Sequence, residues 1–242
     1  MGLYVKLVAY FVIICHVWDM SHGLAKAVII LSGGVDSTTL LYEILDQGYD
    51  VHTLSVNYNQ RHVKELEFAQ KTCRKLNVPH KVIDLSVLGR ELLHNSALTS
   101  EDIEVPEGHY KEENMKLTVV PNRNMILLSL AAGYAISIGA EKVFYGAHLG
   151  DHVIYPDCRK VFVDAMRHAI SLADWRPVEL EAPYLNLDKK DIIVRGKKLG
   201  VDYSLTWTCY KGGNRACGKC GACRERLEAF GGAKIADPIE YD

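Results

Sequence analysis

The stretch Ala27–Leu41, AVIILSGGVDSTTLL, decides the fold class of this chain. An apolar run stops at Ser32, and two glycines, an acid and hydroxyl side chains come before the next apolar run. This order predicts a buried strand that ends in a glycine-rich turn and continues into a helix. The free N–H groups and the dipole at the start of such a helix attract phosphate. We therefore expect a phosphate-binding loop at this point.

The residue types in this loop narrow the kind of phosphate site. Gly33 and Gly34 allow the backbone to turn and to approach an anion closely. Asp36 repels phosphate, so we expect it to cap the helix, to hold the loop or to bind Mg²⁺. The kinase-type pattern G-x-x-x-x-G-K-[ST] and the dinucleotide pattern G-x-G-x-x-G are both missing. The predicted nucleotide-binding residues are Leu31, Ser32, Gly33, Gly34, Val35, Asp36, Ser37, Thr38, Thr39, Leu40 and Leu41.

Length and composition indicate one α/β domain with a small appendage. The chain has 242 residues and a net charge of −2, with 48% hydrophobic and 24% charged residues. This composition is typical of a globular protein. Because there is no basic excess, broad binding to a nucleic-acid backbone is not expected. We divide the chain into an extension (1–23), a phosphate-binding α/β domain (24–204) and a metal-binding C-terminal unit (205–242).

The N-terminal extension allows three interpretations. Its apolar run, Leu7–Val17, is shorter than the roughly 20 residues needed to span a bilayer. With Lys6 before it and the A-K-A sequence after it, the run resembles a secretory signal, but cleavage after Ala27 would remove the start of the first strand. An over-extended translation start, with Met20 as the true first residue, and a packing extension are the other two interpretations.

Alternating apolar runs and helical patterns predict a doubly wound parallel sheet with helices on both faces. The segment Ser86–Lys116 is charged and irregular, and we expect an insertion or mobile loop there and not core. Expected strands are Ala27–Leu31, Val51–Val56, Lys81–Leu85 and Lys142–Tyr145, and expected helices are Ser37–Gln47, Lys64–Leu76, Arg123–Ile138, Val161–Ala173 and Asp188–Leu199.

Four of the seven cysteines gather near the C-terminus at Cys209, Cys217, Cys220 and Cys223. Four thiolates can close a tetrahedral Zn²⁺ site that leaves no position for water, so we expect a structural zinc ion. An iron–sulfur cluster and a redox C-x-x-C pair remain alternatives. The upstream position of the fourth cysteine and the lack of a Cys-Pro pair weaken the iron–sulfur interpretation. A redox pair would leave two cysteines unexplained.

Polar loops follow three predicted elements at the edge where ligands bind in open parallel sheets. NYNQRH follows the second strand, VPNRN opens a helix, and GDHVIYPDCRK follows the fourth strand. Asp157 as a helix cap and Arg61 as a surface residue are simpler interpretations of single positions. The candidate ligand-contact residues are Tyr58, Gln60, Arg61, His62, Arg123, Asp151, Tyr155, Asp157 and Arg159.

Seven motifs occur in order: LSGGVDSTTLL, YNQRH, VPNRN, IYPDCR, TWTCY, CGKCGACRER and DPIEY. Together they resemble the 7-cyano-7-deazaguanine synthases, a family of N-type (PP-loop) ATP pyrophosphatases, from about Lys26 to the C-terminus. The resemblance implies a cytoplasmic, homodimeric ATP-dependent ligase that uses Mg²⁺ and carries a structural Zn²⁺. Such an enzyme converts 7-carboxy-7-deazaguanine and ammonia into the nitrile through an adenylated carboxylate and an amide. The product serves queuosine or archaeosine synthesis, without direct binding to nucleic acid or membrane.

Three motifs depart from the family pattern. Asn59 and Asn122 stand where the family commonly has glycine, and asparagine tolerates left-handed backbone best among the other residues. The loop 151–158 reads DHVIYPDC, where the family often has DYSGYPDC. A tRNA-modifying ATP pyrophosphatase and a zinc and nucleotide-binding module without turnover are the competing functions. The resemblance implies catalytic roles for Asp36, Ser37 and Arg123.

Overall fold

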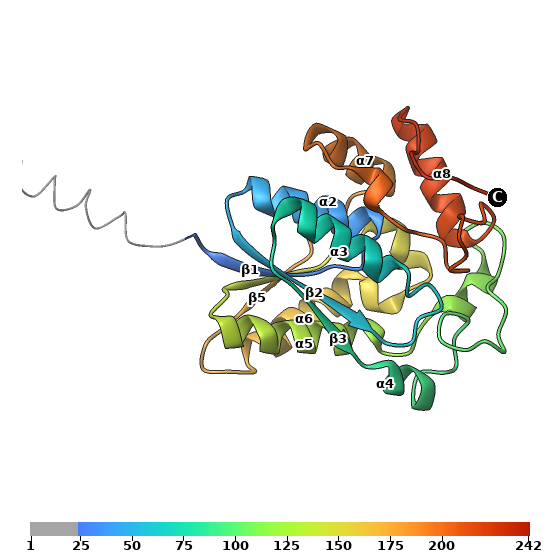
Figure 1. The fold of residues 1–242 in the computed structure, drawn as a ribbon. Helices are drawn as coiled ribbons and strands as arrows, with labels where there is room; N and C mark the ends of the chain where they lie inside the picture. Colours follow the sequence, from blue (N-terminus) through green and yellow to red (C-terminus); the bar gives the residue numbers. More distant parts are fainter. Residues whose placement is uncertain (1–23) are drawn as a thin grey trace, which may run out of the picture.

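A computed structural model describes residues 24–242, so the N-terminal extension and its three interpretations lie outside the described residues (Figure 1). Its centre is a five-stranded sheet in the order β3-β2-β1-β4-β5 with every neighbouring pair parallel. Consecutive strands first extend the sheet on one side of β1 and then on the other, which confirms the doubly wound prediction. The strands are β1 (Lys26–Ile30), β2 (Asp50–Asn57), β3 (His80–Asp84), β4 (Lys142–Phe144) and β5 (Glu179–Glu181).

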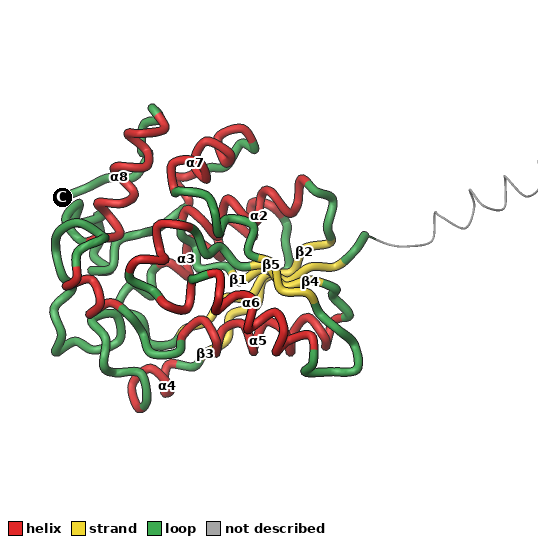
Figure 2. The backbone as a smooth tube through the Cα atoms, turned by 180° about the vertical axis from the view of Figure 1, so that it is seen from behind, coloured by secondary structure: helices red, strands yellow, loops and turns green. Residues whose placement is uncertain are grey.

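Helices cover both faces of the sheet, as Figures 1 and 2 show. Two helices, α5 and α6, lie on one face, and α2, α3, α7 and α8 lie on the other. Within residues 24–242 no helix is long and apolar enough to cross a membrane. The long helices are α2 (Val35–Asp46), α3 (Glu65–Leu76), α5 (Arg123–Ile138), α6 (Lys160–Ser171), α7 (Lys189–Lys198) and α8 (Gly221–Ala233).

Strand β1 shows why the sheet needs helices on both faces. Val28 packs into the cluster that contains Leu128 of α5, whereas Ile29 packs with Leu40 of α2. Successive side chains of a strand point to opposite faces, so a strand that is apolar at every position must be covered twice. Strand β5 was not predicted because its three residues, ELE, carry no apolar run.

The expectation that Ser86–Lys116 lies outside the core was wrong. The segment contains the short helix α4 (Ser86–Glu91), and Ala97 and Leu98 have no exposed surface. The Leu98 carbonyl accepts a hydrogen bond from the Arg61 backbone at 2.7 Å, which ties the segment to the chain that follows β2. The apolar residues pack against the C-terminal unit and the end of β2 with no regular spacing, which periodicity cannot detect.

Arg226 of α8 holds the C-terminal unit together. Its side chain has no exposed surface, and its Nε and Nη2 donate to both carboxylate oxygens of Asp237 at 2.9 Å. Its Nη1 donates to the hydroxyls of Thr206 and Thr208 at 2.8 and 3.0 Å. Bidentate arginine–carboxylate pairs of this kind are strong and directional. The chain end, helix α8 and the connection before the cysteines are therefore joined at one guanidinium.

Replacing Arg226 by Met should lower the free energy of unfolding by about 3–5 kcal/mol, because the buried Asp237 carboxylate loses its partner. Arg224→Met, on the exposed side of the same helix, should change it by less than about 0.5 kcal/mol. Chemical denaturation of the two variants checks this. Equal effects from both substitutions would contradict the role given to Arg226.

Candidate active site

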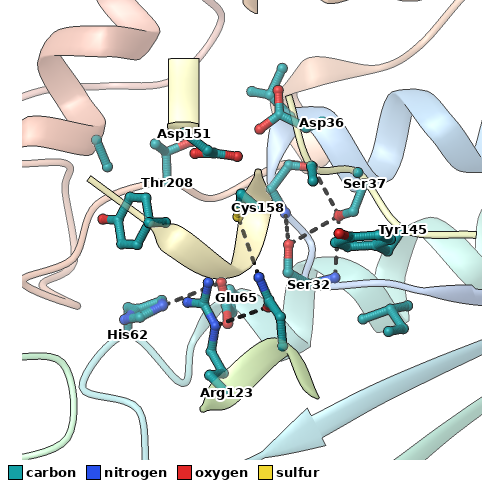
Figure 3. A pocket seen from close by; sticks show the side chains of 18 of the residues that line it. Ser32, Asp36, Ser37, His62, Glu65, Arg123, Tyr145, Asp151, Cys158 and Thr208 are labelled. Carbon is teal, nitrogen blue, oxygen red and sulfur yellow. Dashed lines mark hydrogen bonds and ion pairs between the residues drawn. The ribbon is translucent and has the colours of Figure 1, made fainter. Parts of the chain in front are cut away.

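A pocket of about 230 Å³ opens at the carboxyl ends of the central strands (Figure 3). Its walls come from the β1–α2 loop, the segment after β2, the start of α5, the loop after β4, α7 and the C-terminal unit. This is where open parallel sheets bind ligands, because the strand order reverses there. Among its lining residues are Ser32, Asp36, Ser37, Tyr58, His62, Glu65, Arg123, Tyr145, Asp151, Tyr155, Cys158, Lys189, Trp207, Thr208, Tyr210 and Glu225.

The β1–α2 loop, residues 32–37, has the geometry of an anion-binding site and is called the anion cradle below. The hydroxyl of Ser37 accepts from the Ser32 backbone N–H at 3.2 Å and lies 3.0 Å from the Ser32 hydroxyl. Helix α2 starts after Gly34 without a side-chain cap, so the first N–H groups of the helix are not used by a capping side chain. Gly33 has a φ of 88°, and a Cβ there would lie 2.2 Å from the Glu65 carbonyl oxygen. Only glycine fits this position.

A buried cluster of charges lies beside this loop. Lys189 Nζ is 3.3 Å from Asp36 Oδ2 and forms an ion pair with Glu225. His148 Nε2 lies 3.7 Å from Asp36 Oδ2, 3.6 Å from Asp151 Oδ2 and 3.8 Å from Glu225 Oε1. Burial by itself would lower the pKa of Lys189, but the charges of Asp36 and Glu225 raise it far above its ordinary value. Lys189 is therefore a permanent cation next to the anion cradle.

The opposite end of the pocket contains the carboxyl group of Glu65, whose pKa is raised. Burial raises the pKa of Glu65 to about 8, against a hydrogen bond from Gln60 and the charge of Arg123, which lower it. Gln60 Nε2 donates to Glu65 Oε1 at 3.2 Å, and His62 Nε2 lies 3.5 Å from Glu65 Oε2. Burial and the charge of Arg123 lower the pKa of His62 to about 3. At neutral pH the histidine is uncharged and the carboxyl is mostly protonated.

Arg123, in the first turn of α5, is partly buried in the pocket wall. Burial acts to lower its pKa, but Tyr58 and Asp157 raise it well above the ordinary value. Its Nε donates to Asn124 Oδ1 at 3.2 Å, and its guanidinium lies 6.0 Å from the Tyr155 ring centroid. Burial raises the pKa of Tyr58 to about 12, so the phenol stays neutral. The pocket therefore offers a fixed guanidinium framed by neutral aromatic rings.

The two asparagines that replace glycine have the backbone that the sequence analysis predicted. Asn59 has a φ of 65° and Asn122 a φ of 57°, both in the left-handed region. Asn122 is the residue before α5, so its turn sets the position of the Arg123 side chain. Asparagine keeps both turns without the strain of a branched side chain.

Many of the predicted ligand residues line the pocket. The pocket is lined by residues of the β1–α2 loop and by at least one side chain from each of the three polar motifs. The predicted residues found there are Leu31, Ser32, Gly34, Val35, Asp36, Ser37, Tyr58, His62, Arg123, Asp151 and Tyr155.

Other predicted residues lie outside the pocket wall and make structural contacts. Arg61 Nη2 donates to the carbonyls of Ser100 and Ile103 at 2.6 and 3.1 Å, so it holds the segment after α4. Asp157 accepts from the Asn124 backbone N–H at 3.1 Å, which places it at the start of α5 and not at the helix that follows it. The predicted residues that do not line the pocket are Gly33, Thr38, Thr39, Leu40, Leu41, Gln60, Arg61, Asp157 and Arg159.

Four residues at or beside the pocket were not predicted from the sequence to bind a ligand or to act in catalysis: Glu65, His148, Lys189 and Glu225. Glu65 stands in the first turn of a predicted helix, where an acidic residue is ordinary. Lys189 and Glu225 are 36 residues apart in the sequence and meet only through the packing of α7 on α8. The one available signal was the position of Glu65, three residues after the predicted His62.

The four cysteines of the C-terminal unit converge on one point. Their Sγ atoms all lie within 4.8 Å of one another, and Cys217 Sγ is 3.9 Å from Cys223 Sγ. Hydrogen bonds from Cys220 and Cys223 lower the pKa of the Cys209 thiol. The cluster can hold a metal ion. It adjoins the pocket, because Trp207, Thr208 and Tyr210 on either side of Cys209 line it.

Comparison with known proteins places the chain in a family. Residues 26–234 match the family described as "Queuosine biosynthesis protein QueC". The chain belongs to the QueC family. The 7-cyano-7-deazaguanine synthase of Caldicellulosiruptor saccharolyticus is 61% identical over 90% of this chain and 96% of its own length. The synthase of Methanoregula boonei is 62% identical over 90% and 99%. Among solved structures, an NMN synthetase from Francisella tularensis covers 81% of this chain and 71% of its own, at 17% identity and a TM-score of 0.49.

Replacing Glu65 by Gln tests the protonation of the buried carboxyl. Its pKa rises from 4.5 to about 8 on folding, so between these values the folded state binds one more proton than the unfolded state. The stability that the protonated Glu65 side chain contributes is complete below pH 4.5 and is lost as the pH rises through about 8. In this window the free energy of unfolding of the wild type should fall, relative to that of Glu65→Gln, by up to about 1.4 kcal/mol per pH unit. Denaturant unfolding at pH 5, 6.5 and 8 measures the free energy of unfolding of both proteins. A difference between them that stays constant with pH would refute the raised pKa of Glu65.

Proposed function

We propose that this chain is an ATP-dependent ligase that converts 7-carboxy-7-deazaguanine and ammonia into 7-cyano-7-deazaguanine. The observation that supports it most strongly is the identity of about 60% to synthases of this name over nearly their whole length. The anion cradle at Ser32–Ser37 and the guanidinium of Arg123 in one pocket agree with an enzyme that cleaves ATP beside a carboxylate substrate. The product serves queuosine or archaeosine synthesis.

The first chemical task is to turn a carboxylate into an electrophile. The loop N–H groups and the Ser32 and Ser37 hydroxyls hold the pyrophosphate part of ATP, and Lys189 neutralises its charge. The substrate carboxylate attacks the α-phosphorus and pyrophosphate leaves. Arg123 holds the substrate anion for this attack, since its charge is fixed and it lines the pocket. Positioning and electrostatics supply the rate in this scheme.

Asp36 and Asp151 are suited to hold Mg²⁺ next to the phosphates. Asp36 Oδ1 is buried without a hydrogen-bond partner among the described residues, and an oxygen of this kind is a ligand that Mg²⁺ prefers. The ion would share the negative charge of the pyrophosphate that leaves.

The second task is to add nitrogen and remove oxygen. Ammonia attacks the adenylated carboxylate and forms an amide, and a second adenylation, on the amide oxygen, allows the nitrile to form. Cys158 lines the pocket, but burial and the charges of Asp151 and Asp157 raise its thiol pKa well above the ordinary value. A thiol that stays protonated is a poor nucleophile. The scheme therefore uses no covalent enzyme intermediate.

Zn²⁺ is the proposed ion of the cysteine cluster. A tetrahedral Zn²⁺ with Zn–S bonds of about 2.3 Å separates its sulfurs by about 3.8 Å. The Cys217–Cys223 Sγ separation of 3.9 Å agrees with this value. The ion would stabilise the unit whose residues Trp207 and Tyr210 line the pocket. We also propose a cytoplasmic homodimer, as the resemblance implies.

One incubation tests the proposed function. Purified protein with ATP, Mg²⁺, ammonium and 7-carboxy-7-deazaguanine should yield a product with the mass of the nitrile, together with AMP. ATP cleavage without a nitrile would favour another substrate, with tRNA tested next. No ATP consumption by folded protein would favour the binding module without turnover.

Asp36→Ala should abolish nitrile formation without unfolding the protein, because it removes the carboxylate between the cradle and Lys189. The matched control is Asp46→Ala, at the exposed end of the same helix, which should keep full activity. Turnover and thermal unfolding of both variants are the measurements. A folded and fully active Asp36→Ala would refute the role of the loop.

Cys223→Ser should remove the bound metal and lower the melting temperature, because three thiolates no longer close the site. Elemental analysis should find one zinc per chain in the wild type. Cys73→Ser is the control: Cys73 is buried on α3 beside Thr53, away from the cluster, and its replacement should keep the zinc. Iron in place of zinc would favour the iron–sulfur alternative.

A further inference from the structure

Four carboxyl groups line the pocket, and three of them are paired with cations or with His148. Asp36 and Glu225 lie within 4 Å of Lys189, and both also lie within 4 Å of His148, as does Asp151. These three carboxyl groups are therefore already engaged by Lys189 or His148. Glu65 is different, since no Lys or Arg lies within ion-pair distance of it in residues 24–242.

Glu65 is held in place by neutral partners. Gln60 Nε2 donates to Glu65 Oε1 at 3.2 Å and to the Val56 carbonyl at 3.1 Å, while Gln60 Oε1 accepts from the Tyr58 N–H at 2.8 Å. Gln60 is 3% exposed and is fixed by the end of β2. These contacts fix one carboxyl oxygen of Glu65. The other faces His62 at 3.5 Å, and Glu65 lines the cavity near Arg123 (Figure 3).

His62 adds a second sign that this end of the pocket takes a ligand. Its side chain is about 95% buried and lines the cavity, and its Nδ1 has no hydrogen-bond partner within the described part of the chain. A buried polar atom without a partner costs stability unless something else satisfies it. A ligand in the pocket can supply that partner.

The proposed reaction also needs a proton acceptor. Ammonia carries three hydrogens and the nitrile nitrogen carries none, so three protons must leave the nitrogen. We propose that Glu65, held by Gln60 and His62, is the general base that takes these protons. This inference rests on the proposed function and deepens it. Glu65 is then a catalytic residue, and Gln60 is a positioning residue.

Each proton transfer accompanies one bond change. As the N–C bond forms and AMP leaves with the electron pair of the C–O bond, the first proton passes to Glu65. As the amide oxygen attacks the second ATP and pyrophosphate leaves, the second proton passes. As the remaining C–O bond breaks and AMP leaves with its electron pair, the last N–H proton passes and the third C–N bond forms. Glu65 returns each proton to solvent before the next.

The environment of Glu65 suits this cycle. The groups that face it are His62 on its own segment, Arg123 from α5, and Tyr58 and Gln60 from the end of β2. Burial raises its pKa to about 8, which lets the carboxyl both accept and release a proton near neutral pH. A general base in this position contributes roughly 10²–10⁴-fold to a rate.

The test compares Glu65→Gln with the wild type and with Glu67→Gln, an exposed acid on the same helix. Pyrophosphate release from ATP and 7-carboxy-7-deazaguanine without ammonia reports adenylation, which needs no base. Nitrile formation with ammonia reports the proton transfers. We expect Glu65→Gln to keep adenylation and to lose roughly 10²–10⁴-fold in nitrile formation. Glu67→Gln should match the wild type in both.

The pH profile separates this role from a structural one. With free ammonia held constant, the wild-type rate of nitrile formation should rise with pH through about 8, and the residual rate of Glu65→Gln should be flat. Nitrile formation by Glu65→Gln at the wild-type rate would overturn the inference. If Glu65→Gln does not fold, a flat wild-type profile would overturn it. Wild-type protein that forms neither AMP nor nitrile would overturn the proposed function, and this inference with it.

Discussion

The contact between Gly33 and the start of α3 is the constraint on which the pocket depends. A Cβ at Gly33 would lie 2.2 Å from the Glu65 carbonyl oxygen and 2.9 Å from the Ala69 nitrogen, so the loop and the helix meet backbone to backbone. The Gly33 carbonyl also accepts the Trp207 N–H at 2.9 Å. One glycine thus joins the anion cradle, the helix that carries Glu65 and the C-terminal unit. Any larger residue would separate these three parts.

The C-terminal unit forms part of the pocket wall and is not an appendage. Trp207 and Tyr210 stand on either side of the first cysteine and line the pocket, and Glu225 of α8 reaches Lys189. The Arg226–Asp237 pair fixes α8 to the last residues of the chain. Metal binding, the position of α8 and the charges beside the cradle are therefore coupled. A small unit with few apolar residues needs such ties because its own core is small.

Sequence patterns predicted the parts of the molecule that are local. The strand–loop–helix at Ser32–Ser37, the cysteine spacing and the left-handed turns at Asn59 and Asn122 each depend on neighbouring residues, and the structure has them. The charge cluster could not be predicted in this way, because the packing of three separate elements brings Asp36, Lys189 and Glu225 together.

The distinction between local patterns and contacts of distant segments also explains the predictions that were wrong or missed. Helical and strand periods detect surfaces that face a core regularly, and the segment after β3 buries Ala97 and Leu98 without any such period. Arg61 stands in a motif that suggested ligand contact, yet its guanidinium holds this segment. Glu65 was overlooked because an acid at a helix start is common. Its significance comes from the lack of a Lys or Arg within ion-pair distance among residues 24–242, which only the packed structure shows.

The central claim is that one pocket activates the substrate twice, first as an acid and then as an amide. The most direct test is the ratio of AMP to nitrile formed by the purified protein. We expect two AMP per nitrile from 7-carboxy-7-deazaguanine and one AMP per nitrile when the corresponding amide is supplied instead. One AMP per nitrile from the acid, or an amide that is not converted, would contradict it.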